Sequence, residues 1–238
     1  MAAPRTPAGT RVYAIGDIHG RADLLGELYE LIAADAAGAP ARKRRVVVHI
    51  GDYVDRGPDS RGVVELCLEA PLESFEAVFL KGNHEQMMLE FLDRRDDGRL
   101  WLYNGGDATL ASYGLAPGVV LEPPPVAAVA AAVPEAHRAF LDRLQLSARL
   151  GDYLFVHAGV RPGRPVDAQA ADDLIWIREP FLSSDEDFGC VVVHGHTIAR
   201  APVVRANRIG IDTGAFATGV LTALVLDGPQ RAFLQTGR

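Results

Sequence analysis

The stretch RVYAIGDIHG at residues 11–20 joins an apolar run to a polar cluster bounded by glycines. The apolar run, residues 11–15, is typical of a buried strand. After the cluster, leucine and isoleucine recur at helical spacing, which predicts a helix over about residues 22–34. The chain therefore begins with a strand, a polar loop and a helix.

This unit recurs twice along the chain. Further strands are predicted over residues 46–50 and 75–80, and further helices over residues 60–68 and 85–93. The polar clusters between them are GDYVDRGP at 51–58 and GNHE at 82–85. Strands that alternate with helices indicate an α/β fold, in which ligands bind beyond the carboxyl ends of the strands. All three polar clusters are expected there.

The middle of the chain, roughly residues 94–150, has a different character. It contains a Gly-Gly break at 105–106, prolines at 123–125 and alanine-rich helical segments around 126–145. We interpret it as a helical cap, so that residues 1–238 form a single domain. The later part returns to strands with short turns, which favours a partly antiparallel sheet. These strands are predicted over residues 153–156, 190–193, 203–205, 208–212 and 220–226.

Composition restricts the possible partners. The formal net charge of −7 argues against nucleic acid as the main ligand. The longest apolar run, residues 126–133, is too short to span a bilayer, so no membrane partner is expected. Cys67 and Cys190 form no spaced metal motif and are expected to be buried free thiols, which fits a cytoplasmic protein. The oligomeric state stays open.

A carboxylate, amide or imidazole group follows each of five predicted strands. These candidate metal ligands are Asp17, His19, Asp52, Asn83, His157 and His196. Oxygen donors mixed with imidazoles suit Mn, Fe or Zn better than calcium. Because one carboxylate can bridge two ions, we expect two divalent metal ions that share Asp52. The first ion would take Asp17, His19 and Asp52, and the second Asp52, Asn83, His157 and His196.

Four neighbouring residues have expected catalytic roles. Arg56 and Arg178 are candidate clamps for phosphate oxygens, which a guanidinium grips in a fork. His84 is expected to protonate the departing oxygen, and Asp55 to orient its ring. Paired metals lower the pKa of a shared water and hold phosphoryl oxygens, so the whole set predicts hydrolysis of phosphate esters.

The motifs GDIHG, GDYVDRG and GNHE, in this order and spacing, resemble the signature of the calcineurin-like metallophosphoesterases. More narrowly, they resemble the phosphoprotein phosphatase branch with its bacterial and phage serine/threonine phosphatases. The segments around His157 and His196 match as well, so the resemblance covers about residues 11–215. It implies a β-sandwich flanked by helices, a metal pair that is Mn with Fe or Zn as alternatives, and direct attack on phosphorus.

The resemblance leaves the substrate open. A serine/threonine protein phosphatase acting on a phosphorylated protein or peptide would need an open groove. The same motifs resemble the symmetrical diadenosine-tetraphosphate hydrolases, which would need a closed pocket for a phosphorylated small molecule, built by residues 94–150. A third alternative is a pseudo-enzyme that binds phosphorylated partners without hydrolysis. The complete ligand set and the presence of His84 argue against it.

Other polar and aromatic residues have less specific expected roles. In VHGHT the family pattern favours His196 as the ligand, which leaves His194 beside the ligands or facing the substrate. His49 is expected to be a core histidine and His137 to be exposed. Asp212 is expected to cap a turn. The aromatic residues Trp101 and Tyr103 are expected to pack the cap.

Overall fold

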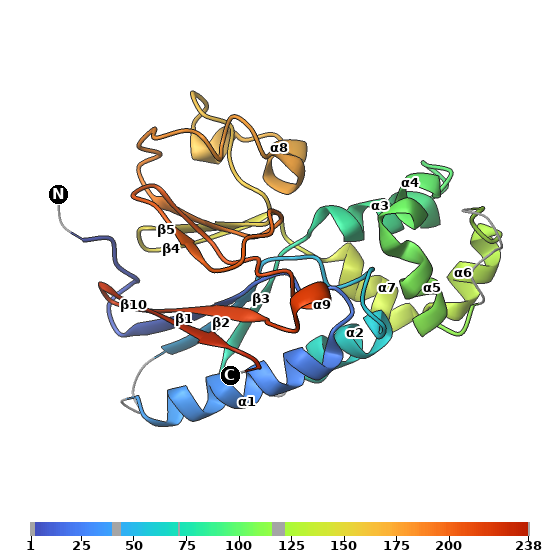
Figure 1. The fold of residues 1–238 in the computed structure, drawn as a ribbon, viewed down its shortest axis with the longest axis horizontal. Coiled ribbons are helices and arrows are strands. Elements are labelled where there is room, and N and C mark those ends of the chain that lie inside the picture. Colours follow the sequence, from blue (N-terminus) through green and yellow to red (C-terminus); the bar gives the residue numbers. More distant parts are fainter. Residues whose placement is uncertain (1–2, 40–43, 71, 116–121, 238) are drawn as a thin grey trace.

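Two five-stranded sheets form the centre of the computed structural model, which describes residues 3–39, 44–70, 72–115 and 122–237. Helices α1 and α2 lie on the outer side of the first sheet, and α8 lies on the outer side of the second (Figure 1). Helices α3 to α7 form a group at one end of the sheets (Figure 1). This arrangement confirms the predicted α/β class and the β-sandwich flanked by helices.

The first sheet has the strand order β10-β9-β1-β2-β3, in which β1, β2 and β3 are parallel to one another. Strand β9 pairs antiparallel with β1, and β10 pairs antiparallel with β9. The second sheet has the order β4-β5-β6-β8-β7 and is also mixed. Strands of the first sheet are β1 (Thr10–Ile15), β2 (Arg44–His49), β3 (Glu76–Phe79), β9 (Thr222–Asp227) and β10 (Gln230–Gln235). Strands of the second are β4 (Ser147–Leu150), β5 (Tyr153–Val156), β6 (Val191–His194), β7 (Val203–Val204) and β8 (Arg208–Gly210).

The helices follow the strands in the predicted order. The first group is α1 (Ala22–Ala37), α2 (Ser60–Glu69) and α3 (Asn83–Leu92). The predicted cap contains α4 (Arg99–Trp101), η1 (Leu102–Gly106), α5 (Asp107–Ser112), α6 (Val126–Ala132) and α7 (Glu135–Asp142). The later helices are η2 (Val166–Ala168), α8 (Ala171–Trp176) and α9 (Ala215–Thr218).

Strands β1, β2 and β9 of the first sheet are mostly buried, and their side chains alternate between two apolar clusters. In β1, Val12 and Ala14 join the cluster between the two sheets, whereas Tyr13 and Ile15 join the cluster under the helices. Both sheets contribute to the cluster between them, with Phe155 of β5 among its members. This shared cluster supports a single domain over residues 1–238, which stays a prediction.

The sequence analysis did not predict two edge strands. Strand β4 lies inside the segment 94–150 that was predicted as a helical cap, so the cap helices end at Asp142 and the predicted boundary was wrong. Positions 116–121 of that segment lie outside the described residues. Strand β10 was also missed. Both strands are partly exposed along their length, so neither carries the apolar run by which the buried strands were recognised.

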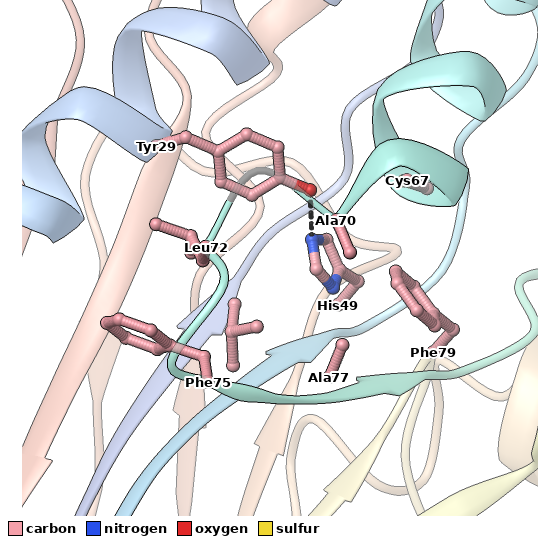
Figure 2. Close-up of a pocket in the computed structure, with 9 residues that line it drawn as sticks. Tyr29, His49, Cys67, Ala70, Leu72, Phe75, Ala77 and Phe79 are labelled. Carbon is pink, nitrogen blue, oxygen red and sulfur yellow. Dashed lines mark hydrogen bonds between the residues drawn. The ribbon is translucent and has the colours of Figure 1, made fainter.

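His49 is a core histidine, as predicted. Its ring is 1% exposed and stacks on Phe79, and its Nε2 lies 2.7 Å from the Tyr29 hydroxyl (Figure 2). His137 contradicts its prediction, because it is only 5% exposed and its Nδ1 lies 2.9 Å from the Tyr113 hydroxyl. The predicted packing role of Tyr103 is also wrong, since its side chain is 76% exposed.

Cys67 and Cys190 are free and buried, as predicted. Burial raises the pKa of the Cys67 thiol to about 12, so it stays protonated at neutral pH. Among the described residues, no helix is both long enough and apolar enough to cross a bilayer.

Candidate metal centre

The loops after β1 and β2 are joined by backbone hydrogen bonds. The His19 amide donates to the Asp52 carbonyl at 2.8 Å, and the Gly20 amide donates to the Tyr53 carbonyl at 2.8 Å. Because parallel strands end at the same edge of a sheet, these bonds hold the first two polar clusters side by side.

Left-handed backbone conformations concentrate in these loops and in the loop after β6. His19, Asp52, Asp55, Arg56 and His196 all have positive φ angles between 45° and 73°. A non-glycine residue in this region carries a conformational cost, and such residues gather at functional sites. These backbone conformations therefore set the directions of the five side chains.

Glu85 ties the second cluster to the third. Its buried carboxylate accepts hydrogen bonds from the amides of Asp52 at 2.9 Å, Tyr53 at 2.7 Å and Gly82 at 2.9 Å. The sequence analysis missed this residue. Its position in the first turn of α3, three residues after the helix cap at Gly82, is the signal that could have identified it.

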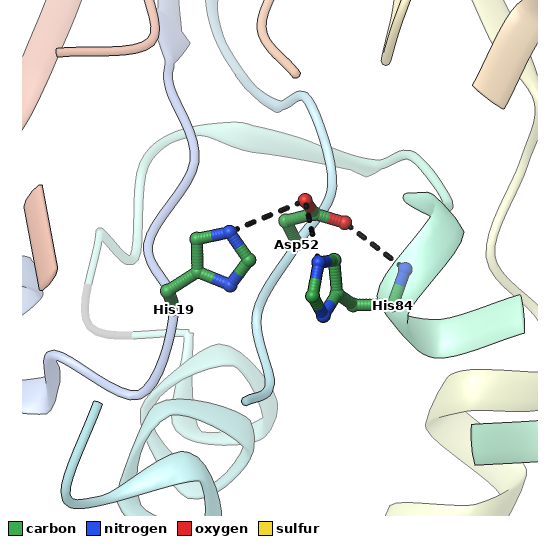
Figure 3. A group of neighbouring side chains, drawn as sticks. All are labelled: His19, Asp52 and His84. Atoms are coloured by element: carbon green, nitrogen blue, oxygen red, sulfur yellow. Dashed lines mark hydrogen bonds and ion pairs between the residues drawn. The ribbon is translucent and has the colours of Figure 1, made fainter. Parts of the chain in front are cut away.

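Asp52 lies where two groups of possible metal ligands meet. Its Oδ2 is 3.3 Å from Nε2 of His19 and 3.4 Å from Nε2 of His157. Nε2 of His84 is 3.9 Å from the same oxygen, and the His84 amide donates to Oδ1 at 3.2 Å (Figure 3). The two groups of mutually close donor atoms are His19, Asp52 and His84, and Asp52, His157 and His196. Asp52 is thus the common member.

The tautomers of two imidazoles follow from their backbone contacts. Nδ1 of His19 lies 2.9 Å from the Val54 carbonyl, and Nδ1 of His157 lies 2.9 Å from the Ile50 carbonyl. Because a carbonyl can only accept, both Nδ1 atoms carry the proton, and the unprotonated Nε2 of each neutral ring lies close to Oδ2 of Asp52. Burial lowers the pKa of both rings, that of His19 to about 3, which keeps them neutral.

Lone pairs that face a carboxylate oxygen at such distances repel it unless a cation lies between them. Metal-binding histidines commonly donate their other ring N–H to a backbone carbonyl, as His19 and His157 do. We infer that the residues around Asp52 fit divalent metal ions.

Asn83 joins the second group. Its Oδ1 lies 2.9 Å from Nε2 of His157 and 2.9 Å from Nδ1 of His196. His196 is buried, and within the described part of the chain its Nε2 has no hydrogen-bond partner. The structure therefore brings together all four residues that were predicted to hold the second ion: Asp52, Asn83, His157 and His196.

Asp17 lies beside this cluster, although it belongs to neither group of mutually close donor atoms. Its Oδ2 accepts a hydrogen bond from the His196 amide at 2.9 Å, and its Oδ1 is buried with no partner among the described residues. Burial, followed by the charges of Asp212 and Asp52, raises the pKa of Asp17 well above its usual range. A nearby cation would relieve this repulsion, so Asp17 remains a proposed ligand.

The structure agrees with the predicted role of Asp212 but not with that of His194. Asp212 caps its turn as predicted, because its Oδ1 accepts a hydrogen bond from the Gly214 amide at 2.8 Å. His194 was expected beside the ligands or facing the substrate. Its ring is 3% exposed and packs edge-on against Phe181 at 5.1 Å between centroids, outside both groups of donor atoms. His194 therefore belongs to the core.

Both predicted arginines lie next to the cluster. Nη1 of Arg56 is 2.9 Å from Nε2 of His19, and its guanidinium lies 5.1 Å from the ring centroid of Phe216. Nη2 of Arg178 is 3.5 Å from the His196 carbonyl, and this side chain is exposed. One cation thus stands beside each group of donor atoms. The sequence analysis missed Phe216, whose place under Arg56 is set by a contact remote in sequence.

His84 and Asp55 form the predicted pair. Nδ1 of His84 lies 2.7 Å from Oδ2 of Asp55, and both side chains are buried. Burial lowers the pKa of His84, but the charges of Asp52 and Asp55 outweigh it, so the net shift is upward. Nε2 of His84 is left facing the cluster around Asp52.

The sequence matches the family model for calcineurin-like phosphoesterases over residues 10–215. The chain belongs to the calcineurin-like phosphoesterases. Serine/threonine-protein phosphatase 1 of Salmonella typhimurium is 30% identical over 220 residues, which cover 89% of each chain. This relative supports the phosphoprotein phosphatase branch of the family, and the chain is a metallophosphoesterase enzyme. Members of the family depend on a binuclear metal centre.

Relatives of this calcineurin-like phosphoesterase act on different phosphate compounds. The asymmetrical bis(5′-nucleosyl)-tetraphosphatase of Bacillus thuringiensis is 26% identical over a 238-residue alignment, with 88% of each chain covered. The crystal structure of a candidate diadenosine tetraphosphatase has a TM-score of 0.69 at 23% identity and covers 98% of both chains, a likeness that shows the fold. The family is therefore established, and the substrate is a separate question.

Gly82 offers a test of the metal centre. A Cβ at this position would lie 2.0 Å from Oδ1 of Asp52 and 2.5 Å from its amide nitrogen. We therefore expect Gly82→Ala to displace Asp52 and to weaken Mn²⁺ binding about tenfold or more, equivalent to about 1.4 kcal/mol. Isothermal titration of the metal-free protein with Mn²⁺ measures this effect.

The matched control is Gly26→Ala on helix α1, where a Cβ would meet no atom within 4 Å. This change should leave Mn²⁺ binding unchanged and raise stability by about 0.5–1 kcal/mol, because alanine favours the helix. If Gly82→Ala bound Mn²⁺ as tightly as the unchanged protein, Asp52 would not be a ligand.

Proposed function

We propose that this calcineurin-like phosphoesterase hydrolyses phosphomonoesters as a serine/threonine protein phosphatase. The observation that carries the proposal is the position of Asp52, which both groups of donor atoms share and which the His84 ring faces. The proposed metals are two Mn²⁺ ions, with Fe or Zn as alternatives. Mixed carboxylate, amide and imidazole donors support this choice.

The proposed ligands divide between the two ions as the sequence predicted. Asp17, His19 and Asp52 would hold one ion, and Asp52, Asn83, His157 and His196 the other. When bound, such a pair lowers the pKa of a water molecule and polarises phosphoryl oxygens. The protein residues around it bind the phosphate group and handle the proton of the leaving group.

Arg56 and Arg178 would bind the phosphate group. Their guanidinium groups lie next to His19 and to the His196 carbonyl respectively, so they approach the cluster from two different loops. A planar guanidinium can donate two parallel hydrogen bonds to phosphate oxygens, and it offsets the negative charge that grows in the transition state.

His84 would donate a proton from Nε2 to the departing oxygen. The contact with Asp55 fixes this geometry, because a carboxylate can only accept and therefore keeps a proton on Nδ1. The raised pKa of His84 means that Nε2 also carries a proton in a larger fraction of molecules near neutral pH. The ring is thus oriented and charged for general-acid catalysis.

An exposed rim beside His196 supports an extended substrate. Arg178 is exposed, Trp176 is 37% exposed and Ile198 is 50% exposed. The ring of Trp176 lies 6.3 Å from that of His196, which places this rim next to the second group of donor atoms. A phosphorylated polypeptide could lie across such a rim with its phosphate beside the arginines.

The second candidate function is cleavage of a dinucleoside tetraphosphate. The relative from Bacillus thuringiensis, which is named for that activity, supports it. Its name describes asymmetrical cleavage, whereas the motifs alone suggested the symmetrical hydrolases. Both reactions would use the same metal ligands, so a comparison of substrates separates them.

The substrate comparison measures phosphate release from a phosphothreonine peptide and hydrolysis of diadenosine tetraphosphate, each with added Mn²⁺ and at matched concentration. We expect kcat/KM for the peptide to exceed that for the dinucleotide at least tenfold, because the rim beside His196 is open. A preference of the same size for the dinucleotide would replace the proposed activity with the second candidate.

His84→Asn tests the proposed acid. The substitution should retain Mn²⁺ binding and should lower kcat by about 10²–10⁴ on an alkyl phosphate, whose leaving oxygen needs a proton. The loss should be much smaller on p-nitrophenyl phosphate, whose leaving group departs as a stable anion. Steady-state kinetics on both substrates provide the measurement. Full activity of this variant on the alkyl phosphate would remove the acid role of His84.

A further inference from the structure

The carboxylate of Asp55 receives hydrogen bonds from the helical segment that follows α3. The indole Nε1 of Trp101 donates to Oδ1 at 2.9 Å and to Oδ2 at 3.1 Å. The hydroxyl of Thr109 donates to Oδ1 at 2.7 Å. Asp55 is 0% exposed, so these protein groups take the place of water around it. Oδ2 also receives the Nδ1 proton of His84.

The direction of the hydrogen bonds around Thr109 is determined by their partners. The Asp55 amide donates to Oγ1 of Thr109 at 2.8 Å and to Oγ of Ser60 at 3.0 Å. The two hydroxyl oxygens lie 2.9 Å apart. Since the one proton of the Thr109 hydroxyl points to the carboxylate, Ser60 donates to Thr109. The result is a directed chain from Ser60 through Thr109 to Asp55.

The indole of Trp101 is itself held in place. Its ring packs against Phe91 at 5.3 Å between centroids, and Phe91 belongs to the same helix α3 that begins with Asn83 and His84. A Cβ on Gly106 would lie 2.7–2.8 Å from three indole atoms, including Nε1, so only glycine leaves room for the ring there. Trp101 is 1% exposed. It therefore joins the segment to Asp55 and to helix α3, at whose start His84 lies.

Asp55 needs these contacts because both its backbone conformation and its burial cost free energy. Its backbone is left-handed, with a φ of 73°, and its charge is fully buried. A buried carboxylate that loses a donor incurs a desolvation cost and can rotate toward other partners. Trp101 donates to both oxygens and Thr109 donates to Oδ1, so these two residues hold the carboxylate whose Oδ2 also contacts His84.

We propose that Trp101 and Thr109 are positioning residues, which fix Asp55 so that the His84 ring presents Nε2 to the leaving oxygen. The proposal rests on the acid role of His84 set out above, and it gives the segment around α4 and α5 a part in the reaction. That segment was expected only to pack or to enclose a nucleotide.

The kinetic test compares Thr109→Val and Trp101→Phe on two substrates. Thr109→Val keeps the side-chain volume but removes the hydroxyl, which donates to the Asp55 carboxylate and accepts from the Asp55 amide. Trp101→Phe removes the indole N–H together with one ring. On an alkyl phosphate kcat should fall about 10–100-fold, a fraction of the full general-acid effect. On p-nitrophenyl phosphate it should change less than about threefold. KM and Mn²⁺ binding should stay the same, and Thr109→Ser, which restores the hydroxyl, should recover the activity.

Ser112→Ala is the matched control for Thr109→Val. Ser112 lies on the same helix α5, and its hydroxyl donates to the Thr109 carbonyl at 2.8 Å without reaching Asp55. This variant should lose no more than about twofold on either substrate. Equal losses on both substrates for Thr109→Val, or reduced Mn²⁺ binding, would show a merely structural role and overturn the proposal.

A spectroscopic test needs no turnover and no metal. The chain has two tryptophans, Trp101 and Trp176, so the two indole N–H signals can be separated by ¹H–¹⁵N NMR. Asp55→Asn should shift the Trp101 indole signal and speed its hydrogen exchange, while the signal of the 37% exposed Trp176 stays in place. An unmoved Trp101 signal would contradict the hydrogen bond on which the proposal depends.

The His84→Asn variant separates this proposal from the proposed function. If His84→Asn loses activity selectively on the alkyl phosphate but Thr109→Val and Trp101→Phe do not, the positioning role alone is wrong. If His84→Asn shows no such selectivity, the acid role fails and the positioning role fails with it.

Discussion

The shared carboxylate of Asp52 is the constraint on which the rest of the site depends. It is buried, and the unprotonated Nε2 atoms of His19 and His157 lie close to one of its oxygens. Without a cation this arrangement is costly, because like partial charges meet where water cannot screen them. Glu85 and the left-handed backbone of Asp52 hold the carboxylate in this position. The protein is thus built to favour bound metal.

The β-sandwich explains how the proposed ligands come together around Asp52 from two sheets. Asp17, His19, Asp52 and Asn83 follow strands of the first sheet, and His157 and His196 follow β5 and β6 of the second. The two groups can meet only if the sheets pack face to face, and the apolar cluster between the sheets provides that packing. Packing of this cluster therefore also brings the proposed ligands of the two sheets together.

The sequence was most informative where polar residues directly follow a buried strand. Buried strands have long apolar runs and the candidate ligands come directly after them, so the sequence predicted both these candidates and the contact between His84 and Asp55 that the structure contains. The partners of Asp55 could not be predicted. Trp101 and Thr109 lie 46 and 54 positions from Asp55 in the sequence, and no motif connects them to it. The prediction that His137 is exposed was wrong for a related reason. An alanine-rich pattern does not reveal that Tyr113 covers that ring.

The helical segment after α3 contacts the site at Asp55 and supplies none of the candidate metal ligands. Its contacts reach Asp55 rather than the metal ligands, so changes in the segment could alter proton transfer while the metal centre stays intact. Arg56 lies at the same junction, since its amide donates to the Gly105 carbonyl at 3.0 Å. The segment thus contacts a proposed phosphate-binding loop and the acid pair together.

The most direct test of the shared carboxylate is the Mn²⁺ content of Asp52→Asn, measured by calorimetric titration and elemental analysis. The unchanged protein should bind two ions per chain. Asp52→Asn should bind both more weakly and retain fewer than one ion after dialysis, whereas the exposed control Asp172→Asn should retain two. Two ions held by Asp52→Asn at unchanged affinity would contradict the account.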